Sequence, residues 1–218
     1  MCFGKVGMLV LACLGMAAPS FAQSNSGVVL PVLVYNYAKV PAGTLHDAQR
    51  HAGHIFQDTA VQFEWHECRV SLSAPQRDPY CVNGLGRKNL VLKILPQSRA
   101  RAFSVGKDVA GLVPPGEMVS DAYVFYDRLY DMARRQSADV AVLLGSSIAH
   151  EFCHLLTGSA GHSDGGLMRG EWTVDLLGQA SPGETQFSAE QHQQIRLGAL
   201  ARARRAEGHS LAQSLTAP

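Results

Sequence analysis

The sequence predicts a single α+β domain, and three observations support that class. The chain has 218 residues, 46% of them hydrophobic, which is enough for one domain with a sizeable core. The patterned segments run in the order strand, helix, several strands and then helices. The sequence shows no internal repeat and no linker, so we expect one unit rather than two.

The first half of the chain supplies most of the expected strands and one helix. Residues 28–37 are rich in β-branched and aromatic side chains, which is typical of a strand. Thr44 can cap a helix that runs to about residue 59 and repeats its apolar side chains on one face. Residues 61–68 alternate between apolar and polar, and residues 89–95 are mostly apolar, so both segments predict strands.

The second half begins with two more strands and continues with helices. Residues 109–113 lie in a segment punctuated by glycine and proline and predict a short edge strand. Residues 122–126 predict another strand, and residues 127–135 predict a short helix. A long, mostly apolar helix is expected over residues 138–157, because Gly158 is well suited to cap its C-terminus.

The last predicted helix opens with the capping box of Ser188 and Gln191 and is expected to end near Arg205. We expect its arginines to complement the helix dipole near that end rather than to form a binding patch; they are Arg196, Arg202, Arg204 and Arg205. Over the whole chain, 19 Lys and Arg balance 18 Asp and Glu. This balance excludes the strongly basic surface of a non-specific nucleic-acid binder.

The N-terminus has the pattern of a secretory signal peptide. Lys5 precedes an apolar run, and small residues precede a cleavage site after Ala22. We therefore expect residues 1–22 to be a signal peptide and residues 23–218 to form a secreted or periplasmic domain, as a monomer. A lipoprotein anchor at Cys13 is the alternative. The sequence has no other segment long and apolar enough to span a bilayer.

Export would place the cysteines of the domain in an oxidising environment, where disulfides persist. Cys68 and Cys81 flank a polar, proline-containing loop, and we expect them to pair. In the chain-entropy model, such a bridge stabilises the fold by about 3 kcal/mol. The two cysteines lack the close spacing of a zinc knuckle. Cys153 is then the remaining thiol, and we expect it to be buried.

The long apolar helix contains the motif H-E-x-x-H as His150, Glu151 and His154. Residues four apart project from the same face of a helix, so two histidine nitrogens can share one zinc ion. The intervening glutamate lies near the metal, where its carboxylate can take a proton from a zinc-bound water. A polar stripe on an amphipathic helix is the alternative interpretation, but these groups would need partners if they were buried.

Catalytic zinc usually has three protein ligands and one open position, so a further ligand must come from outside the motif. His162 is the leading candidate, because Gly158 ends the helix and lets the chain turn back toward it. Carboxylates also bind zinc, which keeps three acidic residues as alternatives: Asp164, Glu171 and Asp175.

The stretch from Ile148 to Met168, IAHEFCHLLTGSAGHSDGGLM, resembles the active-site segment of metzincin metallopeptidases, in particular the matrixin subgroup. That family has H-E-x-x-H-x-x-G-x-x-H, followed by Ser and a methionine turn. Here the glycine comes one residue later and the third histidine two residues later. Arg169 and Gly170 replace the usual proline-containing turn.

The resemblance implies a zincin fold: a twisted mixed sheet, a backing helix, an active-site helix and a C-terminal helix below a methionine turn. It implies that Met168 packs beneath the metal without binding it. It also implies that an edge strand pairs with an extended substrate, and we assign Gly111, Leu112 and Val113 to that role.

Three functions fit these observations. The first is an exported zinc-dependent endopeptidase acting on peptides or proteins, in which Glu151 activates the water and His150, His154 and His162 hold Zn²⁺. The second is a secreted binding or scaffold protein on a zincin fold with structural or vestigial zinc, which the altered spacing before His162 favours. The third is a zinc hydrolase acting on a non-peptide amide.

Overall fold

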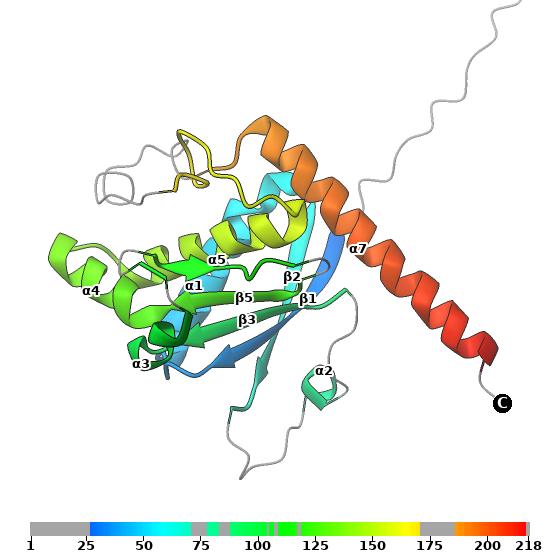
Figure 1. Ribbon diagram of the computed structural model, residues 1–218, viewed down its shortest axis with the longest axis horizontal. Coiled ribbons are helices and arrows are strands. Elements are labelled where there is room, and N and C mark those ends of the chain that lie inside the picture. The colour runs from blue at the N-terminus through cyan, green and yellow to red at the C-terminus, as the bar shows by residue number, and fades with distance from the viewer. Residues whose placement is uncertain are drawn as a thin grey trace, which may run out of the picture.

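The structure is a computed structural model that describes residues 27–70, 78–82, 88–103, 105–106, 109–116, 119–170 and 186–216. Within these residues, five strands form one mixed sheet in the order β2-β1-β3-β5-β4. The first four pair in parallel, and the edge strand β4 is antiparallel to β5 (Figure 1). The strands are β1 (Val28–Asn36), β2 (Val61–Cys68), β3 (Leu90–Leu95), β4 (Gly111–Leu112) and β5 (Asp121–Phe125).

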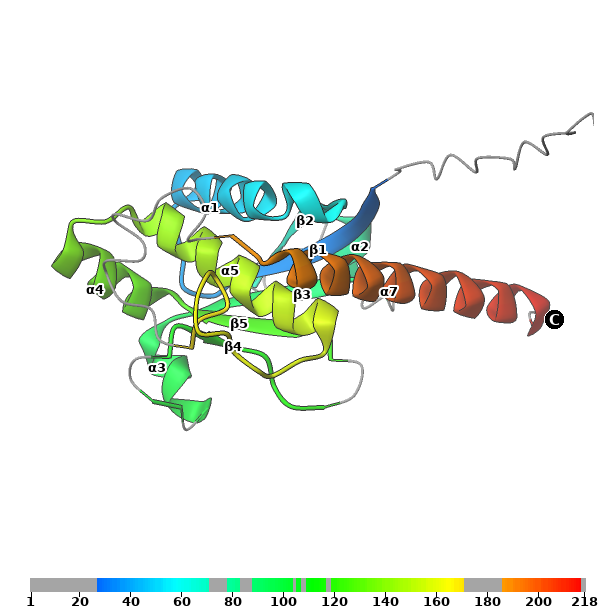
Figure 2. The ribbon, with the colours of Figure 1, turned by 90° about the horizontal axis from the view of Figure 1, so that it is seen from above.

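Helices α1 (Ala42–Ile55), α4 (Tyr126–Gln136), α5 (Val140–Thr157) and α7 (Ala189–Thr216) contribute to one core with the sheet (Figure 2). Side chains alternate along each strand, so every second residue faces that core. In β1 these residues are Leu30, Val32 and Val34, which are fully or almost fully buried. The intervening Leu33 belongs to a separate small cluster on the opposite side of β1.

The remaining described elements are short. They are the 3-10 helices η1 (Gln57–Thr59) and η2 (Arg101–Phe103) and the single-turn helices α2 (Pro79–Val82) and α3 (Gln97–Ala100). Helix α2 carries Cys81, which forms the predicted disulfide with Cys68 at the end of β2. Cys153 is a free thiol and is buried, as expected.

The fold class and the strands follow the prediction closely, whereas three helix ends do not. Pro41, rather than Thr44, is the N-cap of α1, and no side chain caps this helix. Helix α1 also stops at Ile55, because the 3-10 turn η1 covers the rest of the predicted span. Helix α7 runs on to Thr216 instead of ending near Arg205. A single glycine in the last stretch costs only about 1 kcal/mol, which is too little to end a long helix.

Helix α5 is the central helix of the domain. Contrary to the expectation from the sequence, this helix is long and apolar enough to cross a membrane, alone among the described helices, but 83% of it is buried inside the fold. It packs against α1, α4, α7 and the last two strands of the sheet. Its apolar character is therefore that of a core helix in a folded domain.

Candidate metal centre

Helix α5, which carries the H-E-x-x-H residues, is capped at both ends. The carboxylate of Asp139 caps the helix by accepting a hydrogen bond from the amide of Ala141 at 2.8 Å. At the other end Gly158 takes a left-handed conformation with φ of 67°, and its amide donates to the carbonyl of His154. This conformation favours glycine, and it turns the chain back across the helix.

The loop that follows the helix is held by its own hydrogen bonds. The amide of Ser163 donates to the carbonyl of Met168 at 2.8 Å, and the Ser163 hydroxyl donates to the carbonyl of Gly165. The guanidinium of Arg169 donates to the carbonyl of Asp164. These bonds close the loop, and His162 lies directly before the closed segment.

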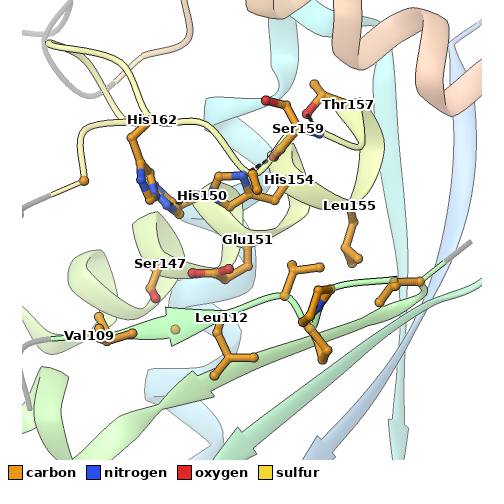
Figure 3. Close-up of a pocket in the computed structure, with 18 of the residues that line it drawn as sticks. Val109, Leu112, Ser147, His150, Glu151, His154, Leu155, Thr157, Ser159 and His162 are labelled. Carbon is orange, nitrogen blue, oxygen red and sulfur yellow. Dashed lines mark hydrogen bonds between the residues drawn. The ribbon is translucent and has the colours of Figure 1, made fainter. Parts of the chain in front are cut away.

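The structure brings three imidazoles together. One ring nitrogen from each of His150, His154 and His162 lies within 4.8 Å of the others. The ring centroid of His162 is 5.2 Å from those of both helical histidines. His150 is buried, His154 is half-buried and His162 is exposed, so the group opens toward solvent on the loop side (Figure 3).

The hydrogen bonds of the two helical histidines fix their tautomers. Nδ1 of His150 lies 2.9 Å from the carbonyl oxygen of Leu167, and Nδ1 of His154 lies 2.6 Å from that of Ser159. A carbonyl oxygen only accepts, so both Nδ1 atoms carry the proton. In the neutral rings the lone pairs are then on the Nε2 atoms.

These two Nε2 atoms are 3.1 Å apart. Two facing lone pairs repel each other, and a shared cation removes this repulsion. Two nitrogens bound to one tetrahedral zinc ion at about 2.0–2.1 Å would lie about 3.3 Å apart, close to the observed spacing. The donor set and its backbone hydrogen bonds therefore fit Zn²⁺.

Burial keeps the two helical rings neutral and available as ligands. It lowers the pKa of His150 to about 4, although the hydrogen bond to Leu167 opposes this shift. Burial also lowers the pKa of His154, against the hydrogen bond to Ser159. Neutral imidazole is the form that binds a metal, so no proton needs to leave these rings near pH 7.

Glu151 is 4% exposed and lies beside the three histidines (Figure 3). Burial raises the pKa of its carboxyl to about 8. The backbone of Gly111 in β4 lies against it, because a Cβ at that position would be 2.6 Å from Oε1 of Glu151. A carboxyl with a pKa near neutrality can both accept and release a proton.

A cleft of about 1960 Å³ runs past the three histidines and Glu151. Small-molecule sites typically occupy about 300–1,000 Å³, so the size favours a longer, extended ligand. Gly111, Leu112 and Val113 line the cleft. The predicted edge strand over residues 109–113 is shorter in the structure, where only Gly111–Leu112 pairs as strand.

The other predicted site residues fall in three places. Met168 is 3% exposed and belongs to the main core, next to the residue whose carbonyl binds His150. Asp164 is exposed and is not part of the histidine group. Glu171 and Asp175 lie outside the described residues. The sequence did not reveal the carbonyls of Ser159 and Leu167, because backbone groups leave no signal in residue type.

Comparison with known proteins bears on the fold. No protein-family model matches the sequence, and no curated protein matches it. Among solved structures, the chain is similar to a zinc-dependent peptidase from Methanocorpusculum labreanum, with a TM-score of 0.50 and 16% identity over 75% of this chain and 99% of that one. The chain therefore shares the fold of this solved structure. An archaemetzincin from Methanopyrus kandleri has a TM-score of 0.43 and 14% identity over 81% of this chain and 98% of its own.

Proposed function

We propose that this protein is an exported zinc-dependent endopeptidase. The observation that carries the proposal is the convergence of His150, His154 and His162 beside the buried carboxyl of Glu151. In this proposal the three histidines hold Zn²⁺ through one ring nitrogen each. The carbonyls of Leu167 and Ser159 keep two of the rings in the ligating tautomer.

Bound zinc would supply Lewis acidity, which lowers the pKa of water and polarises a substrate carbonyl. Glu151 is the proton carrier in this proposal. Its carboxylate takes a proton from the attacking water and later gives it to the leaving amine. In the metal-free protein burial raises the pKa of this carboxyl, which favours proton uptake.

The cleft supports an extended peptide as substrate. Strand β4 is the last strand of the sheet order and, among the described residues, pairs with β5 alone, so its outer edge can accept backbone hydrogen bonds from a peptide. Figure 3 shows Leu112 on this strand below Glu151. The cleft continues past the histidines toward both α4 and α7, which favours cleavage within a chain rather than at its end.

One structural feature supports export. The Cys68–Cys81 disulfide is consistent with an oxidising compartment. The proposed signal peptide, residues 1–22, and the alternative anchor at Cys13 lie outside the described residues.

The scaffold alternative drew its support from the altered spacing before His162, and the geometry of the loop accommodates that spacing.

The test is Glu151→Ala in the full chain loaded with zinc. The variant should keep bound zinc, measured by elemental analysis, while peptide hydrolysis falls by about 10²–10⁴-fold. Asp164→Ala is the matched control, because it removes an exposed carboxylate from the adjacent loop and should keep both zinc and activity. Full hydrolysis by Glu151→Ala would refute the mechanism, and a zinc-loaded wild-type protein that cleaves no peptide would favour the scaffold function.

A further inference from the structure

Helix α7 brings two arginines to one end of the cleft. It crosses the C-terminal end of α5, where the backbone of Gly198 lies directly against the carbonyl of Leu156 (Figure 2). Arg202 and Arg205 follow on α7 and line the cleft together with Val119 and Ser120. We call these four residues the arginine end of the cleft.

Arg202 is held rigidly and has only neutral partners. Its guanidinium donates to the carbonyl of Val119 at 2.8 Å, to the hydroxyl of Ser120 at 3.1 Å and to the carbonyl of Asn89 at 3.2 Å. No carboxylate forms an ion pair with it among the described residues. Burial, together with the charge of the neighbouring Arg205, lowers the pKa of Arg202. This positive charge is half-buried and has no counter-ion among the described residues, which is a costly arrangement.

Arg205 lies one helical turn away and is exposed. Its Nε donates to the carbonyl of Ala201 at 3.3 Å, and within the described part of the chain it forms no ion pair. Helix α7 continues to Thr216, so neither arginine is in the last turn. The predicted role of these residues in complementing the C-terminal dipole is therefore wrong, since that effect fades within one turn.

The charges that line the cleft are unevenly distributed. Its lining includes four arginines and two acidic residues. Asp131 lies on α4, at the opposite end, together with Arg128 and Arg135, while Glu151 lies in the middle. Among the described lining residues, the arginine end thus carries two positive charges and no carboxylate. A cleft of this kind attracts and orients negative charge.

We propose that Arg202 and Arg205 form a subsite for an acidic side chain, so that the preferred substrates are peptides with Asp or Glu at a position that reaches the arginine end. Arg205 pairs directly with the carboxylate, and Arg202 supplies a fixed second charge. A guanidinium pairs with a carboxylate through parallel hydrogen bonds, which gives geometric selectivity as well as attraction. This inference rests on the proposed peptidase function.

The first experiment measures cleavage by the zinc-loaded full chain. A set of otherwise identical neutral peptides carries one glutamate, or one glutamine, at each position in turn. At one position or two adjacent positions, glutamate should raise kcat/KM about five-fold over glutamine, in line with a charge pair that is partly exposed. Raising the salt concentration should reduce this preference.

The variants assign the preference to the arginine end. Arg205→Gln should abolish the difference between the glutamate and glutamine peptides, and Arg205→Glu should reverse it. Arg204→Gln is the matched control, because Arg204 is an exposed neighbour that does not line the cleft. Arg202→Gln is not needed for the conclusion, since this residue also ties α7 to Val119 and Asn89.

A binding experiment separates this inference from the peptidase function. Zinc-loaded Glu151→Gln should bind a labelled glutamate peptide about five-fold more tightly than its glutamine counterpart, measured by fluorescence anisotropy. Adding Arg205→Gln should remove the difference. If the wild type cleaves no peptide but this binding preference is present, the peptidase function fails and the acidic subsite stands. Equal binding and equal cleavage of the two peptides would overturn the subsite alone.

Discussion

Two faces of helix α5 are buried to a similar degree and have opposite consequences for the protein. On one face, Leu144, Ile148 and Phe152 are fully buried. On the other, His150 is 6% exposed and Glu151 is 4% exposed. Burying the apolar face stabilises the fold, whereas burying the polar face costs solvation energy, which appears as the shifted pKa values of His150 and Glu151. The burial of the apolar face therefore offsets the solvation cost of burying His150 and Glu151 on the polar face.

The free energy of unfolding of the metal-free protein tests this contrast. The apolar face should respond most strongly. Phe152 packs its ring against Phe63 and Trp65, with centroid distances of 5.1 and 6.0 Å. Phe152→Ala should therefore lower the free energy of unfolding by about 3–5 kcal/mol, measured by chemical denaturation. Phe152→Leu is the control and should cost clearly less, and equal losses for the two variants would contradict a tightly packed face.

An effect that grows with pH is expected from the carboxyl on the polar face. The ordinary pKa of this group is 4.5, and burial raises it to about 8 in the folded protein. Between these values the folded protein retains a proton that the unfolded chain has released, so stability falls as the pH rises. Glu151→Gln removes this loss, and its stability relative to the wild type should rise by at most about 1.4 kcal/mol per pH unit.

Denaturation at a series of pH values checks this expectation. The difference between Glu151→Gln and the wild type should grow between about pH 4.5 and pH 8 and stay constant above that range. His150 is present in both proteins, so its own lowered pKa largely cancels in the difference. A difference that does not vary with pH would mean that the carboxyl is not desolvated in the metal-free protein.

The smallest effect on metal-free stability should come from the exposed ligand candidate. His162→Ala removes an exposed ring, so the free energy of unfolding without metal should change by less than about 0.5 kcal/mol. With zinc, the two proteins should diverge. Zinc at 100 times its dissociation constant should stabilise the wild type by about 2.7 kcal/mol, and the variant should gain far less.

Asp164→Ala is again the control for this experiment, because it changes the same loop without changing the histidine group. Zinc should stabilise this variant as much as it stabilises the wild type. Equal stabilisation of His162→Ala by zinc would exclude His162 as a ligand and would favour one of the alternative carboxylates as the third ligand.

Local patterns in the sequence predicted most of the fold. The alternation in residues 61–68 gave the limits of β2, and the capping box of Ser188 and Gln191 is present with both reciprocal hydrogen bonds. Helix ends were harder to predict. The sequence predicts that the last helix ends near Arg205, yet α7 continues through Gly208 to Thr216, since one unfavourable residue does not outweigh continued propagation.

For the candidate site, the candidate ligands could be predicted from the sequence, whereas the backbone groups that orient them could not. The four-residue spacing places His150 and His154 on one face, and Gly158 explains how His162 returns to them. The carbonyls of Ser159 and Leu167 depend on the path of the loop, which residue types do not specify. The charges of Arg202 and Arg205 were visible, but their position at the cleft depends on how α7 crosses α5.

The close approach of Gly111 to Glu151 gives a criterion for comparing chains that share this fold. A methyl group at that point of the edge strand would occupy the space of the carboxylate oxygen. A relative that keeps the helical motif but has a bulkier residue there must hold its glutamate elsewhere or tilt its strand outward. The residue at this strand position therefore separates candidate hydrolases, which can hold the glutamate as this protein does, from chains that cannot.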